Sequence, residues 1–252
     1  MSFRALFLSL LAGFAAVTSA HAQEWGQEPP CDIGLPPGAM SFYLAHGPSG
    51  SCGPGCSDWI AAEGSIQWDT FKRLIAFLEH HPNRKLPVVI NIAPASNLFV
   101  ATTLGRIFRE RGLDTTVGSI EIPECARKTH EECLALKRAE RPVRATVNVE
   151  GVRCDLACVL MLAGGVGRYM PPQAKVFVGW RMMKGSMCRS LSEERREALG
   201  LSFDERLRVY LRQMGIATEF ADLLEENSRL LRTIDLTPQD WRRFKLVNSS
   251  TL

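Results

Sequence analysis

Apolar positions along the chain follow two different spacings, and each spacing predicts a different kind of element. Residues 57–66 and 85–92 are short and largely apolar, and both are typical of strands. The second run is rich in β-branched side chains and contains an apolar stretch over residues 86–90, which indicates a strand buried on both faces. Between the two runs, large apolar side chains recur every three or four residues and predict an amphipathic helix. These side chains are Trp68, Phe71, Leu74, Ile75 and Leu78.

The middle of the chain continues this alternation of strands and helices. Asn97 is suited to cap a helix that ends at Gly112. Residues 114–120 and 145–149 are strand candidates, and residues 120–142, which are highly charged, are expected to form a surface excursion between them. The inward-facing positions of the predicted helix are Leu104, Ile107 and Phe108.

The last third of the chain completes the pattern of an α/β layered domain with a largely parallel sheet. Residues 156–163 contain almost nothing polar, which predicts a helix buried on all sides. Residues 174–180 form another apolar strand candidate. The remaining predicted elements are helices over 203–214 and 217–227, broken at Gly215, and a helix that starts with Thr237 as N-cap and Pro238 at its first position.

The N-terminal region divides into two parts that precede this domain. Residues 1–22 have an early Arg, an apolar core over 5–17 and the small-residue site Ala20-His21-Ala22, which together predict a secretory signal peptide. The alternative is a retained membrane anchor, but the apolar core is shorter than the roughly 20 residues that span a bilayer. Residues 23–57 are rich in Pro, Gly and Cys and are expected to be irregular. We therefore expect a protein that is periplasmic or otherwise exported, with cleavage near Ala22 and its main domain over residues 58–252.

Charge and composition exclude some classes of function. The formal net charge is +3, and acidic and basic residues are interleaved, as in residues 192–200. That pattern gives no basic footprint for nucleic acid. No stretch after the signal peptide is long and apolar enough to span a membrane. We also expect no cofactor.

The cysteines indicate disulfides more than metal binding. All eight follow the signal peptide, and an even count in an exported chain favours disulfides. Zinc is the alternative, but the C-x3-C spacing is not that of the common zinc knuckle, so we expect no metal. The connectivity cannot be deduced, and the pairing that we favour joins Cys125 and Cys133 to Cys154 and Cys158. The eight are Cys31, Cys52, Cys56, Cys125, Cys133, Cys154, Cys158 and Cys188.

Several segments, taken in order, resemble exported bacterial proteins that are related to the proteolytic subunit of Clp protease and have the ClpP/crotonase fold. One of them contains the motif "CDLACVLMLAGG", in which two cysteines flank the head of the buried helix. The resemblance extends from about residue 58 to residue 248. The segments are 59–66, 86–118, 154–180, 210–216 and 236–248.

The resemblance implies a serine protease site, and this chain departs from it at every position. Active members place a nucleophilic Ser at the head of the buried helix, a His general base at the end of the next core strand, a Pro-Gly-Gly-Ser oxyanion turn and an acid that orients the His. Ala95 at a glycine position of the turn puts the oxyanion hole in doubt. The corresponding positions here are Leu156, Gly179, the turn Pro94-Ala95-Ser96-Asn97, and Thr233 with Asp235 two residues away.

The resemblance therefore predicts a catalytically inactive protein, a pseudoenzyme, with a binding or scaffolding role toward an unknown protein or peptide. The rival hypothesis is an active serine or cysteine hydrolase that uses relocated residues, such as Ser96 or a thiolate of Cys154 or Cys158. Acyl-CoA chemistry of the crotonase type is a third hypothesis, disfavoured because coenzyme A is intracellular. By analogy with the fold, the late helices around residues 210–224 could form the interface of a homo-oligomer.

Overall fold

The computed structural model describes residues 38–179 and 193–250, and over residues 193–202 it describes the backbone alone. The predicted signal peptide, Cys31 and Cys188 lie outside the described residues. So do four positions within the described stretches, namely Pro54, Asn83, Ala95 and Leu231.

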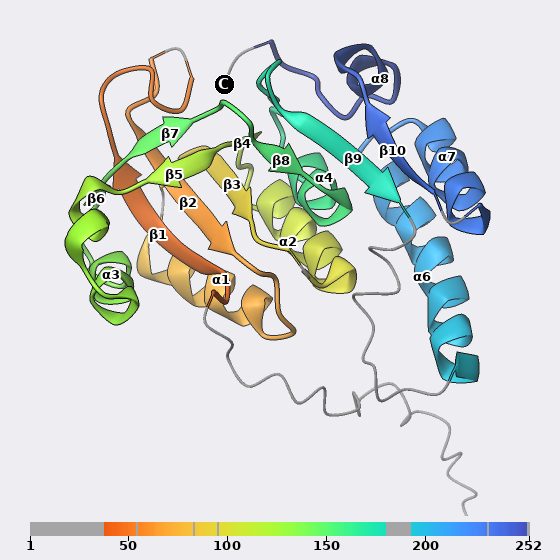
Figure 1. Ribbon diagram of the computed structural model, residues 1–252, viewed down its shortest axis with the longest axis horizontal. Helices are drawn as coiled ribbons and strands as arrows, with labels where there is room; N and C mark the ends of the chain where they lie inside the picture. The colour runs from red at the N-terminus through yellow and green to blue at the C-terminus, as the bar shows by residue number, and fades with distance from the viewer. Residues whose placement is uncertain are drawn as a thin grey trace, which may run out of the picture.

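The core of the fold is a five-stranded mixed sheet with the order β4-β3-β2-β1-β6 (Figure 1). The pair β1–β2 is antiparallel, and β2–β3, β3–β4 and β1–β6 are parallel, so the expectation of a mostly parallel sheet is confirmed. The strands are β1 (Ser41–His46), β2 (Asp58–Gly64), β3 (Val88–Ile92), β4 (Thr115–Val117) and β6 (Val143–Arg144).

Strand β1 corrects the expectation that residues 23–57 are irregular. It pairs with β2 over six residues, from Ser41 opposite Glu63 to His46 opposite Asp58. Its middle residues are buried, because β1 lies inside the sheet between β2 and β6. The ordered domain therefore begins well before residue 58.

Helices cover one face of this sheet: α1 (Thr70–His80), α2 (Leu98–Glu110) and α4 (Leu156–Ala163). The predicted cap of α2 is confirmed, since the Asn97 side chain accepts a hydrogen bond from the Val100 N–H at 3.1 Å. Helices α2 and α4 cross at two glycines. A Cβ added to Gly164 would lie 2.3 Å from the Cα of Gly105, so only glycine permits this close approach.

The excursion after β4 covers the other face of the sheet. It contains the antiparallel pair β5 (Ser119–Glu121) and β7 (Thr146–Asn148), and between them the 3-10 helix η1 (Pro123–Arg127) and α3 (His130–Lys137). Figure 1 shows the β5–β7 ribbon crossing in front of the central strands. A second apolar cluster lies on this face and includes Tyr43, Trp59 and Val89. The prediction of a surface excursion over residues 120–142 is confirmed.

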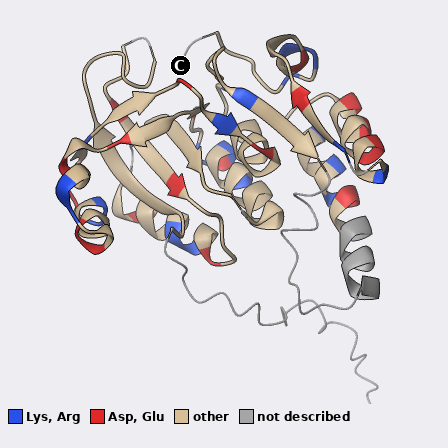
Figure 2. Ribbon diagram, viewed as in Figure 1, with Lys and Arg blue, Asp and Glu red and all other residues tan. Residues whose placement is uncertain are grey.

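A smaller sheet with the order β10-β9-β8 and three helices form the rest of the domain. Helices α6 and α7 are joined by Arg208, which forms ion pairs with Asp222 and Glu225. Figure 2 shows acidic and basic residues mixed on α3, whereas α7 is mainly acidic with Arg229 at its end. The elements are β8 (Arg153–Cys154), β9 (Lys175–Gly179), α6 (Glu193–Gln213), α7 (Thr218–Arg229), β10 (Thr233–Leu236) and α8 (Pro238–Arg243).

Two buried or half-buried arginines bind the backbone carbonyls that follow α4 and α6. Arg109 donates to the carbonyls of Ala163 and Gly164 at the end of α4, at 3.1 and 3.0 Å. Arg168 is only 3% exposed and lies beside them. Burial and the neighbouring Arg109 lower the pKa of Arg168 to about 10, so its guanidinium remains charged at neutral pH. Its side chain donates to the carbonyls of Gly165, Met214, Lys245 and Leu246.

Replacing Arg168 is expected to destabilise the whole domain. In Arg168→Met, several buried carbonyls lose their donors, and each unsatisfied group costs about 1–3 kcal/mol. We expect the free energy of unfolding to fall by about 3 kcal/mol or more, measured by urea denaturation of the mature chain. The matched control is Arg212→Met on exposed α6 surface, which should change it by about 0.5 kcal/mol at most. Equal midpoints for the two variants would contradict the role of Arg168.

Candidate functional site

Helix α4 is buried over its entire length, which confirms the prediction from the sequence. Each of its eight residues is at most 1% exposed, and Leu156, the first of them, is 0% exposed. Asp155 is the N-cap, and its Oδ1 accepts a hydrogen bond from the Cys158 N–H at 3.0 Å. The residue at the head of the helix is therefore a hydrocarbon side chain enclosed in the core.

A disulfide encloses this head. Cys154 at the end of β8 pairs with Cys158 in the first turn of α4, with a Cα–Cα distance of 5.1 Å. The favoured pairing of Cys125 and Cys133 with Cys154 and Cys158 is wrong. Cys125 in η1 instead pairs with Cys133 in α3, at a Cα–Cα distance of 5.2 Å.

The physical reason for this correction is that each bond closes within a single local turn. Cys154 and Cys158 lie on either side of a strand-to-helix turn, and Cys125 and Cys133 on two adjoining helices. A third pair, Cys52–Cys56, also closes a short loop, at a Cα–Cα distance of 5.2 Å. All six described cysteines are thus paired, and the thiolate role considered for Cys154 and Cys158 has no free thiol.

Asp155 is the titratable group nearest the helix head. Burial raises the pKa of its carboxyl, and the N–H groups of Cys158 and Ala157 partly oppose that shift by binding the carboxylate. A carboxylate at a helix N-terminus also benefits from the helix dipole. The loss of hydration on burial outweighs these favourable contacts, so the charged side chain caps α4 at a cost in stability.

Replacing Asp155 with Asn is expected to remove that cost, so the difference in the free energy of unfolding between wild type and variant should depend on pH. With a folded-state pKa above the unfolded value, the native state binds more protons just above pH 3.8, and stability falls as pH rises through that window. Asn still caps the helix but carries no charge. Its free energy of unfolding should equal the wild-type value near pH 3.5 and match or exceed it at pH 7, measured by urea denaturation.

The matched variant is Asp155→Ala, which removes the cap. It should be about 1 kcal/mol less stable than Asp155→Asn at pH 7. If Asn and Ala were equally destabilising at neutral pH, the carboxylate charge itself would be essential and this account of Asp155 would be wrong.

Gly179 ends strand β9 and lies directly opposite Thr233 of β10. Gly179, which corresponds to the base in the resemblance, therefore neighbours Thr233, near which the resemblance places the acid. Cys154 of β8 pairs with Val176, so the strand leading into α4 also adjoins β9. Asp235 lies opposite Phe177 and is exposed, on the same face of β10 as Thr233.

The space beside Gly179 is filled by the backbone of β10. A Cβ at this position would lie 2.6 Å from the carbonyl oxygen of Arg232 and 2.7 Å from the Cα of Thr233. Such distances are shorter than any van der Waals contact, and backbone atoms cannot rotate away. The position therefore accepts no side chain unless β10 moves.

Gly179→Ala should destabilise the protein, although alanine is ordinarily tolerated better than glycine inside a strand. Overpacking against the backbone of β10 is expected to cost about 1–3 kcal/mol. Thermal denaturation would then show a midpoint several degrees lower than that of the wild type. Lys175→Ala, at the exposed other end of β9, is the control and should leave the midpoint nearly unchanged. A midpoint for Gly179→Ala at or above the wild-type value would show that the strands can separate freely.

Ser96 performs a structural task in its turn. It is 4% exposed, its Oγ donates to the carbonyl of Ala93 at 2.9 Å, and it accepts from the N–H of Ile66 at 3.0 Å. Asn97 follows as the cap of α2, and Ala95 lies outside the described residues. In the turn predicted to form an oxyanion hole, Ser96 and Asn97 therefore make hydrogen bonds that join the sheet to α2.

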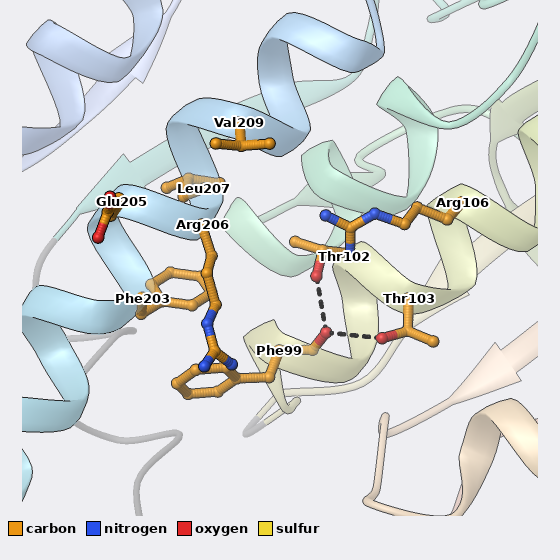
Figure 3. Close-up of a pocket in the computed structure, with 9 residues that line it drawn as sticks. All are labelled: Phe99, Thr102, Thr103, Arg106, Phe203, Glu205, Arg206, Leu207 and Val209. Carbon is orange, nitrogen blue, oxygen red and sulfur yellow. Dashed lines mark hydrogen bonds between the residues drawn. The ribbon is translucent and has the colours of Figure 1, made fainter. Parts of the chain in front are cut away.

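Sequence reasoning missed a cavity between α2 and α6. It has a volume of about 360 Å³, and Figure 3 shows side chains of both helices around it. The apolar spacing of the two helices predicts their inward faces, but it does not tell how far apart the helices pack. The lining residues are Phe99, Thr102, Thr103, Arg106, Phe203, Glu205, Arg206, Leu207 and Val209.

Comparison with solved structures finds a similarity to ClpP. A mutant ClpP1 from Listeria monocytogenes superposes with a TM-score of 0.43 and 11% sequence identity, over 71% of this chain and 80% of that chain. No family model and no curated protein matches the sequence. Within the described residues, every helix is too short or too polar to cross a membrane, and no group of three or more His, Cys, Asp or Glu could hold a metal ion.

Proposed function

We propose that this chain is a catalytically inactive, exported relative of the ClpP/crotonase-fold serine proteases that acts by binding or scaffolding. The observation that carries the proposal is the pair of Leu156, fully enclosed at the head of α4, and Gly179, where no side chain fits.

The head of α4 lacks the chemistry of covalent hydrolysis. That mechanism needs a nucleophile and a base within hydrogen-bonding reach of each other. Leu156 offers neither a nucleophilic atom nor access to solvent. The sulfur atoms of Cys154 and Cys158, which flank Leu156 in the sequence, are bonded to each other, so neither is a free thiol. These features favour a structural function for this turn.

Packing at Gly179 supports the same conclusion independently. If a base had been lost by a simple substitution, a space large enough for an imidazole would remain beside the strand. The backbone of Arg232 and Thr233 instead occupies that space. The surroundings of position 179 are therefore adapted to glycine, as expected where no base is in use.

The rival hypothesis, a hydrolase with relocated residues, depends above all on Ser96. Its hydroxyl already takes part in two hydrogen bonds to the backbone, at Ala93 and Ile66. A nucleophilic serine needs that proton to be directed at a base. The observed donation to the Ala93 carbonyl favours the structural role of Ser96.

Export is the proposed localisation. The three described cysteine pairs lie at disulfide distance, and such bonds persist in oxidising compartments such as the periplasm. In this proposal the ligand is a protein or peptide, and copies of the chain assemble through the late helices α6 and α7.

The test is active-site labelling of the mature chain, produced from residue 23 with its disulfides formed. We expect no labelling by a fluorophosphonate probe and no turnover of a panel of unstructured peptides, because Leu156 offers no nucleophile and Gly179 no base. Mass spectrometry of the treated protein measures the labelling, with an active serine protease as the positive control.

Two variants separate the outcomes. Ser96→Ala removes the candidate nucleophile, and Ser65→Ala removes a hydroxyl that donates to the carbonyl of Gly38 outside the turn. Labelling at one residue, with peptide turnover lost when that residue alone is replaced, would overturn the proposal in favour of a relocated hydrolase.

A further inference from the structure

The cavity between α2 and α6 has the dimensions and walls of a small-molecule site. Its volume of about 360 Å³ falls within the range of about 300–1,000 Å³ that is typical of ligand pockets. Four of its lining residues come from α2 and five from α6 (Figure 3). Both helices are held by the core, so the pocket is formed before any ligand arrives.

The floor of the pocket is apolar and fixed. The rings of Phe99 and Phe203 meet edge to face, with centroids 4.6 Å apart. The rings of Trp68 and Phe99 also stack, with centroids 6.3 Å apart. Leu207 is buried beside Phe203, whereas Val209 is 43% exposed at the rim. A ligand lying on this floor would remove from water the exposed apolar surface of Phe99 and Val209.

Arg106 supplies the polar group of the pocket. Its guanidinium lies 5.2 Å from the centroid of the Tyr210 ring, and its Nε donates to Gln213 at 3.5 Å. Tyr210 is itself fully buried and donates to the Leu160 carbonyl at 2.6 Å, so the ring beneath the guanidinium cannot move. Within the described part of the chain, the two η nitrogens of Arg106 have no hydrogen-bond partner. A half-buried guanidinium with unused donors is suited to bind a carboxylate in a bidentate manner.

The other polar residues do not compete for that guanidinium. The hydroxyls of Thr102 and Thr103 donate to the carbonyl of Phe99, at 2.8 and 3.2 Å. Glu205 is exposed, and in Figure 3 its carboxylate points away from Arg106. Arg206, the second basic residue of the lining, extends from α6 toward the Phe99 side. The guanidinium of Arg106 therefore presents positive charge beside the apolar floor.

We infer that the pocket between α2 and α6 binds a small amphipathic carboxylate, with its anionic group on Arg106 and its apolar body against Phe99, Phe203 and Leu207. A cationic ligand would be repelled by Arg106, and a neutral one would leave Arg106 without an oppositely charged partner. The carboxylate can belong to a free aliphatic or aromatic acid or to the C-terminus of a short apolar peptide. This site is separate from the head of α4, so the inference holds whether or not the chain proves to be catalytic.

Isothermal titration calorimetry of the mature chain tests the inference with ligands of equal chain length. Octanoate is expected to bind at least tenfold more tightly than octanol and octyltrimethylammonium. A tetrapeptide ending in leucine is compared with octanoate, and the tighter binder of the two identifies the source of the carboxylate. The C-terminal amide of the same peptide should bind more weakly than the peptide with its free carboxylate.

Variants connect the binding to the pocket. Arg106→Gln should weaken octanoate binding at least tenfold and leave octanol unaffected, because a charge-assisted pair is lost. Val209→Glu, at an exposed position on the rim, places a carboxylate at the mouth and should also weaken octanoate binding. Arg212→Gln on α6, exposed and outside the lining, is the matched control and should bind as the wild type does.

Several results would overturn the inference. Octanol or the ammonium compound could bind as tightly as octanoate, or none of the carboxylates could bind at millimolar concentration. Unchanged octanoate affinity in either Arg106→Gln or Val209→Glu would place the binding elsewhere. Circular dichroism of each variant verifies that the fold is intact, and the affinity of Val209→Glu decides the outcome if Arg106→Gln does not fold.

Discussion

Enclosing α4 completely in the core obliges the protein to supply every hydrogen bond that water would otherwise provide at the helix ends. The first N–H groups and last carbonyls of any helix have no partner within the helix. At the N-terminal end Asp155 binds the N–H of Cys158. At the C-terminal end, the side chain of Arg109 donates hydrogen bonds to the carbonyls of Ala163 and Gly164. Much of the surrounding structure is arranged to meet this requirement.

The requirement also explains why distant parts of the chain meet around α4. The hydroxyl of Thr115, on β4, donates to the carbonyl of Leu162, and that of Tyr210, on α6, donates to the carbonyl of Leu160. Arg168 extends the same network to the end of α6 and to the C-terminal segment. The close contact of Gly105 and Gly164 then allows α2 to pack against α4. A leucine at the head of the helix fits this dry environment better than a serine would.

Much of the fold could be predicted from local patterns. The buried helix 156–163, the cap at Asn97 and the start of α8 at Thr237 follow from residue types within a few positions of each other. Strand β1 could not be predicted, because it lies between Pro- and Gly-rich stretches and becomes a strand through its pairing with β2. The disulfide pairing failed for a related reason, since spacing along the chain does not reveal which turns bring two cysteines together.

The features that define the candidate sites are properties of packing. A glycine in the sequence does not indicate that a neighbouring backbone fills the space beside it, as it does at Gly179. Arg168 follows a glycine-rich stretch and gives no sign of being buried. The pocket of Arg106 needs two helices far apart in the sequence at a particular separation. Such features depend on tertiary distances that no local pattern encodes.

The partners of Arg168 have a consequence for the timing of folding. Two of them, the carbonyls of Lys245 and Leu246, do not exist until those residues have been synthesised. Until then the guanidinium can be buried only without part of its hydrogen bonding, although Arg109 already binds the carbonyls at the end of α4. A chain that ends before residue 245 therefore cannot bury this guanidinium with its full set of hydrogen bonds, and the last step of folding waits for the C-terminal segment.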